Sequence, residues 1–308
     1  MKCLLILLLT AAGCSSPNPR SVLLGAIPAE EVLPYGAIEI EPWSCLGYDG
    51  VRIRTPRWDI CTTIQIPALH KRLPVALEAA LANMRETLNS STLSLPEPRE
   101  PMTTCLMSDR RQWTNLARML LPEHAESMQG LSRGGFTSQG VALLYDIDRR
   151  EHCRNTIALA LHEGWHQYVQ TSFQSGLPAW LDEGLATVME GYRLLPDGLE
   201  IDHDANRQRK RRAWWLLRRD RLQPLAEFLA DDPHAAMARG QNQLLDYYAQ
   251  AWAYMRYMLA DSERTDVLRR LLEQAADGRR VTVVTPTPSE DAAFQAWCVE
   301  SLRPTWWQ

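Results

Sequence analysis

Long apolar runs are missing from this sequence of 308 residues, and none reaches the length of a bilayer-spanning helix. Such a helix needs about 20 consecutive apolar residues, so we expect no transmembrane segment. An excess of basic charge is also missing, because 33 Lys and Arg face 37 Asp and Glu, which gives a net charge of −4. Dedicated nucleic-acid-binding proteins are usually basic. We therefore expect no nucleic acid among the partners.

The N-terminus has the pattern of an export signal. A single positive charge precedes a short apolar run at residues 3–9, which is too short to cross a bilayer. The small residues Ala12 and Gly13 before Cys14 resemble a bacterial lipobox, in which the Cys is lipidated and becomes the first mature residue. The alternative is an ordinary secretory signal that is cleaved near Gly13. The lipobox predicts a signal peptide over 1–13, a lipidated tether over 14–35 and a membrane-anchored lipoprotein of the cell envelope.

The remaining cysteines lack the close CxxC spacing of zinc knuckles. In an exported protein cysteines usually pair, and Cys45 with Cys61, both in the β-like N-terminal segment, is the first pairing we consider. Connectivity does not follow from sequence, and the five residues can also be structural or free. The five are Cys45, Cys61, Cys105, Cys153 and Cys298.

Hydrophobic periodicity predicts strands first and helices after them, which indicates the α+β class. A mixed sheet with helices should form an N-terminal α+β region over 36–130, and a region over 131–308 should be mostly helical towards its end. Strands are expected at 37–40, 51–54, 62–66, 103–107 and 140–145, and helices at 73–88, 111–121, 156–172, 178–190, 206–221, 225–230, 244–259, 265–276 and 290–302.

The clearest chemical signal is the HExxH pattern formed by His162, Glu163 and His166. Four residues of a helix turn through about 400°, so the two His lie within about 40° of each other on one face. Both imidazoles can then bind one metal ion, and zinc accepts neutral His nitrogens. Glu163 can reach a water on that ion as a general base. The alternative is an amphipathic helix with two His on its polar face.

Catalytic zinc normally takes three protein ligands, so a third must come from elsewhere. Pro178 suits the first turn of a second helix, and the short loop at 174–176 would let this helix return antiparallel to the first. That return would bring Glu183 towards the level of the two His. The neighbouring Asp182 is a rival ligand that points about 100° away from Glu183.

The second segment carries a specific resemblance. HExxH followed by Trp-Leu-x-Glu-Gly-x-Ala resembles the gluzincin metallopeptidases of the peptidase-MA-like superfamily, and the export signal is similar to that of its uncharacterised bacterial exported members. The resemblance implies a zincin-like fold, Zn²⁺ as cofactor, Glu183 as third zinc ligand beside His162 and His166, and hydrolysis of peptide bonds. The residues that match the second motif are Trp180, Leu181, Glu183, Gly184 and Ala186.

The resemblance also suggests a donor for the developing oxyanion. In aminopeptidase-like gluzincins this donor is a Tyr at the start of a helix after the Glu ligand, and Tyr248 stands in the corresponding place. Tyr248 can equally be packing in an aromatic-rich helix. Glu190 shares a helical face with Glu183, where it would either orient a His or be solvated.

Two further segments have open interpretations. The strand at 140–145, preceded by Gly134 and Gly135, is either an edge strand that binds extended peptide or an internal strand. The basic run from Arg207 to Arg221, interrupted by two Trp, either rests on anionic headgroups or is a helix with one packed stripe and one solvated face.

Two functions of different class are compatible with these patterns. One is an exported zinc metallopeptidase that acts on peptide or protein substrates, with the region 131–308 as its catalytic part. The other is a non-catalytic envelope lipoprotein that uses the zincin fold as a binding or scaffolding module. The presence of Glu163 favours the enzyme, because a scaffold has no physical need for the base.

Overall fold

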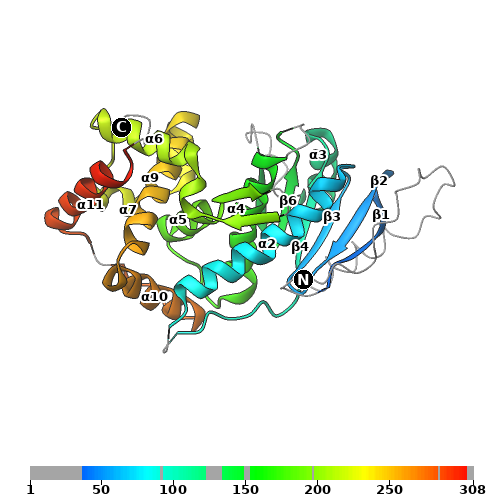
Figure 1. Cartoon of the computed structure of the whole chain (residues 1–308), viewed down its shortest axis with the longest axis horizontal. Helices are drawn as coiled ribbons and strands as arrows, with labels where there is room; N and C mark the ends of the chain where they lie inside the picture. The colour runs from blue at the N-terminus through cyan, green and yellow to red at the C-terminus, as the bar shows by residue number, and fades with distance from the viewer. Residues whose placement is uncertain are drawn as a thin grey trace. The chain divides into compact units, whose positions relative to one another are not determined.

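The computed structural model describes residues 37–90, 93–122, 134–148, 153–195, 198–283 and 285–303 (Figure 1). The predicted signal peptide, Cys14 and the tether lie outside these residues. The described residues form two compact units, one from the residues up to Ala80 with Pro98–Thr171, the other from Leu81–Glu97 with the residues after Thr171. The first unit holds a mixed sheet and the second is mostly helical, which confirms the predicted α+β class. The division predicted at residue 130 stays a prediction.

A six-stranded mixed sheet in the order β1-β2-β3-β4-β6-β5 forms the first unit. The first three strands pair antiparallel, β3, β4 and β6 pair parallel, and β5 pairs antiparallel with β6. Parallel neighbours need crossover connections, and α2 and α3 supply them. The bounds are β1 Glu39–Cys45, β2 Tyr48–Arg54, β3 Trp58–Thr62, α2 Pro67–Leu88, β4 Met102–Met107, α3 Arg110–Leu120, β5 Gly135–Ser138, β6 Val141–Tyr145 and α4 Arg154–Ser172.

The strand predicted at 62–66 was wrong, because β3 ends at Thr62. The hydroxyl of Thr62 accepts a hydrogen bond from the Ile64 amide at 3.1 Å, and α2 begins at Pro67, so the chain turns out of the sheet here. The strand itself contains Asp59, whose carboxylate is paired with Arg52 on β2. Because Asp59 is charged, a search for apolar residues does not recognise this strand. The ion pair with Arg52 on the neighbouring strand accounts for a charged residue at this position.

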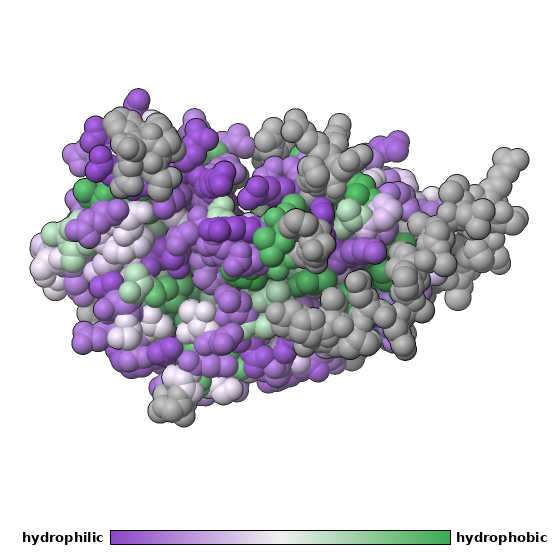
Figure 2. Space-filling view, in the orientation of Figure 1, coloured by the Kyte–Doolittle hydropathy of each residue, from purple (hydrophilic) through white to green (hydrophobic). Residues whose placement is uncertain are grey.

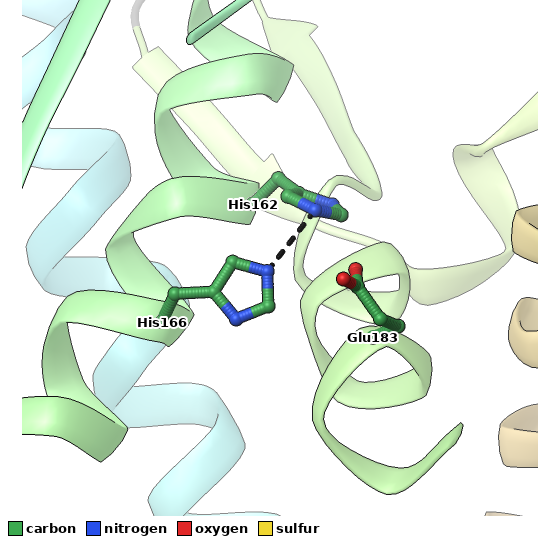
Figure 3. Close-up of side chains that lie close together, drawn as sticks. All are labelled: His162, His166 and Glu183. Carbon is green, nitrogen blue, oxygen red and sulfur yellow. Dashed lines mark hydrogen bonds between the residues drawn. The ribbon is translucent and has the colours of Figure 1, made fainter. Parts of the chain in front are cut away.

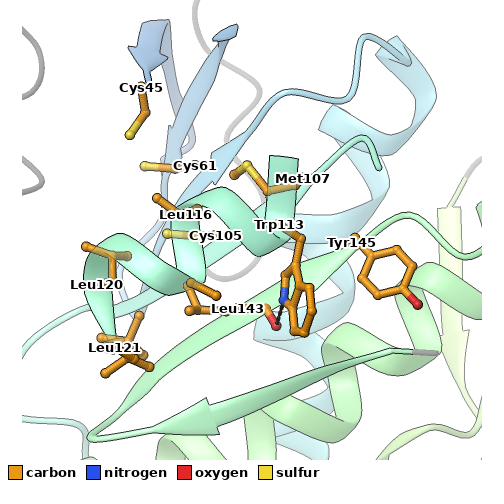
Figure 4. Close-up of a cluster of buried hydrophobic side chains, with 12 residues drawn as sticks. Cys45, Cys61, Cys105, Met107, Trp113, Leu116, Leu120, Leu121, Leu143 and Tyr145 are labelled. Carbon is orange, nitrogen blue, oxygen red and sulfur yellow. Dashed lines mark hydrogen bonds between the residues drawn. The ribbon is translucent and has the colours of Figure 1, made fainter. Parts of the chain in front are cut away.

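Three thiols lie in one buried cluster of the first unit (Figure 4). Cys61 of β3 is the direct neighbour of Cys105 on β4, and Cys45 at the end of β1 belongs to the same cluster. All three are free, so the predicted disulfide between Cys45 and Cys61 was wrong. Burial raises the pKa of the Cys61 thiol to about 12 and also raises that of Cys105. These thiols therefore act as small apolar core residues, as buried Cys commonly does.

The second unit is a group of helices around α9, with a short hairpin of β7 and β8. The hairpin and α8 were not expected from the sequence, since each is short. The bounds are α5 Ala179–Met189, β7 Tyr192–Leu195, β8 Gly198–Ile201, η3 His203–Ala205, α6 Arg207–Arg218, α7 Leu225–Ala230, α8 Pro233–Arg239, α9 Gln241–Leu259, α10 Ser262–Ala276 and α11 Pro288–Ser301.

Hydrophilic residues predominate on the described surface in the view of Figure 2, with apolar residues in small groups. The apolar side chains of both units are largely internal, among them Trp58, Trp113, Trp165 and Trp252. Among the described helices, none combines the length and the apolar character that crossing a bilayer requires.

Candidate metal centre

The helix α4 is fixed to the sheet by one buried amide. Gln167 is fully buried, and its Nε2 donates to the carbonyl oxygens of Thr103 at 2.6 Å and Gly140 at 3.2 Å. Its Oε1 accepts from the hydroxyl of Thr104 at 2.9 Å and, at 3.4 Å, from the indole of Trp58. A buried amide needs these partners, because an unmade hydrogen bond costs the desolvation of the group. The bonds fix the rotation of α4 beside His166.

The two His of the HExxH pattern point the same way from α4 (Figure 3). Their Nε2 atoms are 3.3 Å apart, and one ring donates to the other. The rings are close to perpendicular, with centroids 4.9 Å apart. His162 is buried and His166 is half-buried. The predicted helix therefore places both rings on one face, as one turn of separation requires.

Glu163 lies between the two His in sequence and is only 6% exposed. The hydroxyl of Thr137 on β5 donates to its Oε2 at 2.7 Å. Such a bond to a carboxylate oxygen is charge-assisted and fixes the orientation of the group. It leaves Oε1 as the oxygen that can accept a proton.

Glu183 lies on α5, which begins at Ala179, one residue after the predicted start at Pro178. The following Gly184 lets α5 approach α9 closely, because a Cβ there would lie 2.8 Å from the Met255 Cε and 3.3 Å from the carbonyl oxygen of Ala251. The ring of Trp180 packs against Tyr254 of α9 in the same interface. The glycine and the Trp of the second motif thus have a structural role in seating the helix that carries Glu183.

The described residues include a group that could hold a metal ion, made of His162, His166 and Glu183 (Figure 3). One ligand atom from each lies within 4.8 Å of the other two. The carboxylate in this group is that of Glu183 and not that of the rival Asp182. Two imidazoles and one carboxylate form a donor set that catalytic zinc sites use.

The separation of the two His nitrogens fits this metal. Two ligands at about 2.05 Å from a tetrahedral zinc are about 3.3 Å apart. The Nε2 atoms of His162 and His166 are at that distance. Metal binding would replace the proton that the two rings now share, as ligation by neutral imidazole requires.

Glu190 is largely buried and bound by Arg209 and Asn206, so the expectation that it is solvated was wrong. Its carboxylate accepts from Arg209 at 2.9 and 3.1 Å and from the amide of Asn206 at 2.6 Å. The Arg209 guanidinium lies over the ring of Tyr248, 5.0 Å from its centroid. Burial lowers the pKa of Arg209, but the charge and hydrogen bonds of Glu190, with smaller contributions from Tyr248 and Glu183, outweigh it and raise the pKa above its ordinary value.

Tyr248 is in the second turn of α9 and its ring is half-buried beneath Arg209. Its neighbour Tyr247 is buried, and burial, followed by the charge of Glu183, raises the Tyr247 pKa well above its ordinary value of 10.0. Packing therefore accounts for Tyr247, whereas the catalytic role of Tyr248 stays a prediction.

Sequence reasoning missed Gln167, Thr137 and Arg209. Gln167 falls on the buried side of α4, and a polar residue at an apolar position of a helix is a signal for a structural hydrogen bond. Thr137 gave no signal, because the short strand β5 was not recognised. Arg209 was one of many basic residues in a run, and only the fold separates it from the others.

Comparisons with known protein families, with curated proteins and with solved structures found no match for this chain.

Proposed function

We propose that this chain is a zinc-dependent metallopeptidase with a zincin-like fold, related to the gluzincins. The observation that carries the proposal is the 3.3 Å separation of the His162 and His166 Nε2 atoms on one turn of α4, since it equals the spacing of two ligands on a tetrahedral ion. Glu183 supplies the third ligand, because its carboxylate belongs to the same group of side chains.

The chain's own residues divide the chemistry between them. His162 and His166 would hold the metal through Nε2, and Glu183 would hold it through a carboxylate oxygen. A bound zinc ion supplies Lewis-acid polarisation of the scissile carbonyl and lowers the pKa of its water to about 7. Glu163 then takes the proton of the attacking water on Oε1, while Thr137 keeps Oε2 in place. The same carboxyl group can return that proton to the leaving nitrogen.

The substrate is a peptide or protein, and the location is outside the cytoplasm. The N-terminal pattern supports a lipoprotein of the cell envelope that is anchored through Cys14. In this proposal the lipid holds the enzyme at a membrane. A Cys14→Ser variant should lose detergent partitioning or remain unprocessed, and release of an unmodified wild-type N-terminus would replace the lipoprotein by a secreted protein.

Metal content tests the ligand set. The purified chain should hold about one zinc ion, and Glu183→Ala should lose it because two remaining ligands hold the ion poorly. Asp182→Ala is the matched control, since it removes the neighbouring carboxylate of the same helix and should keep the ion. Full zinc occupancy in Glu183→Ala would show that another residue is the third ligand.

Glu163→Gln tests catalysis separately from metal binding. The amide preserves the shape of the side chain and should keep the zinc, but it cannot accept the proton. We expect loss of hydrolysis of a diverse peptide library by about 10² to 10⁴-fold. If the wild type binds zinc yet cleaves nothing, and Glu163→Gln leaves the cellular phenotype intact, the peptidase proposal is wrong and a scaffold explains the protein better.

A further inference from the structure

The helix α6 carries six basic residues and no acidic residue among its twelve. The fold divides these six between two sides of the helix. Three of its residues point towards the interior of the second unit, namely Ala213, Leu216 and the paired Arg209. Their positions around the helix differ by about 60° at most, so they define its packed side.

Basic residues near the packed side have acidic partners. Arg209 pairs with Glu190, and Arg212 donates to the carboxylate of Asp246 at 2.6 Å and to the carbonyl oxygen of Asn242 at 2.8 Å. These contacts attach α6 to α5 and α9. The charges of Arg209 and Arg212 are therefore balanced by carboxylates of the same protein.

The opposite side, called here the outer face, consists of six residues. Their positions on the helix fall within about 140° of one another. Arg207, Arg211 and Arg218 are exposed, while the other three are half-buried. Its four cationic side chains, those of Arg207, Lys210, Arg211 and Arg218, form no ion pair with another described residue. The outer face is Arg207, Lys210, Arg211, Trp214, Trp215 and Arg218.

The two Trp of the outer face are held by cations. The Arg218 guanidinium lies 5.9 Å from the ring of Trp214, and those of Arg219 and Arg221 lie 4.9 and 5.0 Å from the ring of Trp215. Such stacking orders a long side chain and keeps its charge at the surface. The result is a set of prearranged Trp and Arg side chains on one exposed side of a helix.

We propose that the outer face of α6 docks on an anionic lipid surface. Basic side chains near such a surface gain about 1 kcal/mol each, and Trp prefers the headgroup region, where its ring is half in water. A face that served only solubility would mix charges of both signs, and this one carries a single sign. Charge complementarity therefore selects anionic headgroups, and the Trp pair favours a membrane over a soluble polyanion.

The proposal does not depend on the metal centre. It assigns α6 a role in holding the second unit against a membrane, in addition to any anchor at the N-terminus. Loss of zinc or of hydrolysis would leave it unaffected.

Vesicle binding tests the outer face. The probe is the purified full-length chain with Cys14→Ser, so that no attached lipid contributes, mixed with vesicles of phosphatidylcholine alone or with about one third phosphatidylglycerol. We expect sedimentation with the anionic vesicles only, and less of it at high ionic strength because salt screens the charges.

The decisive variant replaces Arg207, Arg211 and Arg218 by Gln. Its vesicle affinity should fall roughly 100-fold, the product of about fivefold for each charge. The matched control replaces three exposed arginines of other helices by Gln and should bind like the parent chain. Replacement of the outer arginines by Lys should preserve binding. The control arginines are Arg111, Arg118 and Arg270.

Three outcomes would overturn the proposal. One is equal binding to neutral and anionic vesicles, and another is equal loss in the outer-face variant and its control. The third is binding to soluble heparin or DNA without binding to vesicles, which would assign the face to a soluble polyanion. Circular dichroism of each variant shows whether the fold is retained, and the single Arg→Gln variants, each expected to lose about fivefold in vesicle affinity, give the answer if the triple variant unfolds.

Discussion

Replacing Gln167 by Leu should be among the most destabilising single changes in the first unit. The substitution keeps a similar volume but removes the amide that bonds α4 to the sheet. It leaves the carbonyl of Gly140 and the hydroxyl of Thr104 buried without this partner. Two close bonds and two longer ones contribute about 1 kcal/mol each at most, and the groups left unsatisfied add about 1 to 3 kcal/mol. We expect a loss of about 3 to 5 kcal/mol in the free energy of unfolding.

The same helix offers a matched control for this change. Gln170 also bonds the sheet region, accepting from the Gly140 amide at 2.9 Å and donating to the Thr137 carbonyl at 3.4 Å, but it is exposed. Water can replace both bonds, so Gln170→Leu should cost about 1 kcal/mol or less. Urea unfolding followed by circular dichroism measures both variants. Equal losses for the two would refute the argument that burial sets the cost.

Three further predictions concern the base, the second helix and the thiols. If the peptidase proposal is right, Thr137→Val should lower kcat roughly tenfold with little change in KM, and Thr137→Ser should restore it, because the hydroxyl orients Glu163. Gly184→Ala should cost no more than about 1 kcal/mol in urea unfolding, because its Cβ would displace only the end of the Met255 side chain and approach the Ala251 carbonyl while Ala favours the helix, and Gly176→Ala, with open space around it, should cost little. Because burial raises the Cys61 pKa from 9.0 to about 12, the unfolded chain loses this proton first, so between these values the stability of the wild type should fall more steeply than that of Cys61→Ala, by about 1.4 kcal/mol per pH unit. A stability difference between the two that is flat over that range would contradict the burial of this thiol.

Local sequence patterns predicted the structure correctly where a feature depends on a single helix or strand. The helical spacing of His162 and His166 placed both rings on one face of α4, and Pro178 marked the start of the helix that carries Glu183. The apolar run of β6 likewise predicted a strand, and all five of its residues are buried. Each of these depends on bonds within one segment, so periodicity and capping chemistry are sufficient.

Contacts between segments that are far apart in the chain could not be predicted from the sequence. The disulfide expected between Cys45 and Cys61 does not form, and Cys61 lies instead beside Cys105, because strand register decides which thiols meet. The bounds of β3 were predicted wrongly because the strand contains the charged Asp59. Its partner, Arg52, lies on the neighbouring strand β2, and the sequence does not reveal that pairing.

The sequence by itself determined the α+β class and the spacing of the HExxH pattern, since both follow from hydrophobic period and helical geometry. Tertiary structure alone decided which polar residues form hydrogen bonds to the residues of the HExxH helix and to the sheet. Thr137 meets Glu163, and Gln167 joins α4 to the sheet, through contacts between segments far apart in the chain. It also decided which arginines of α6 turn inward to acidic partners and which stay outside. In a run of like charges, the packing of the helix decides which side chains meet acidic partners inside the protein and which remain exposed to solvent.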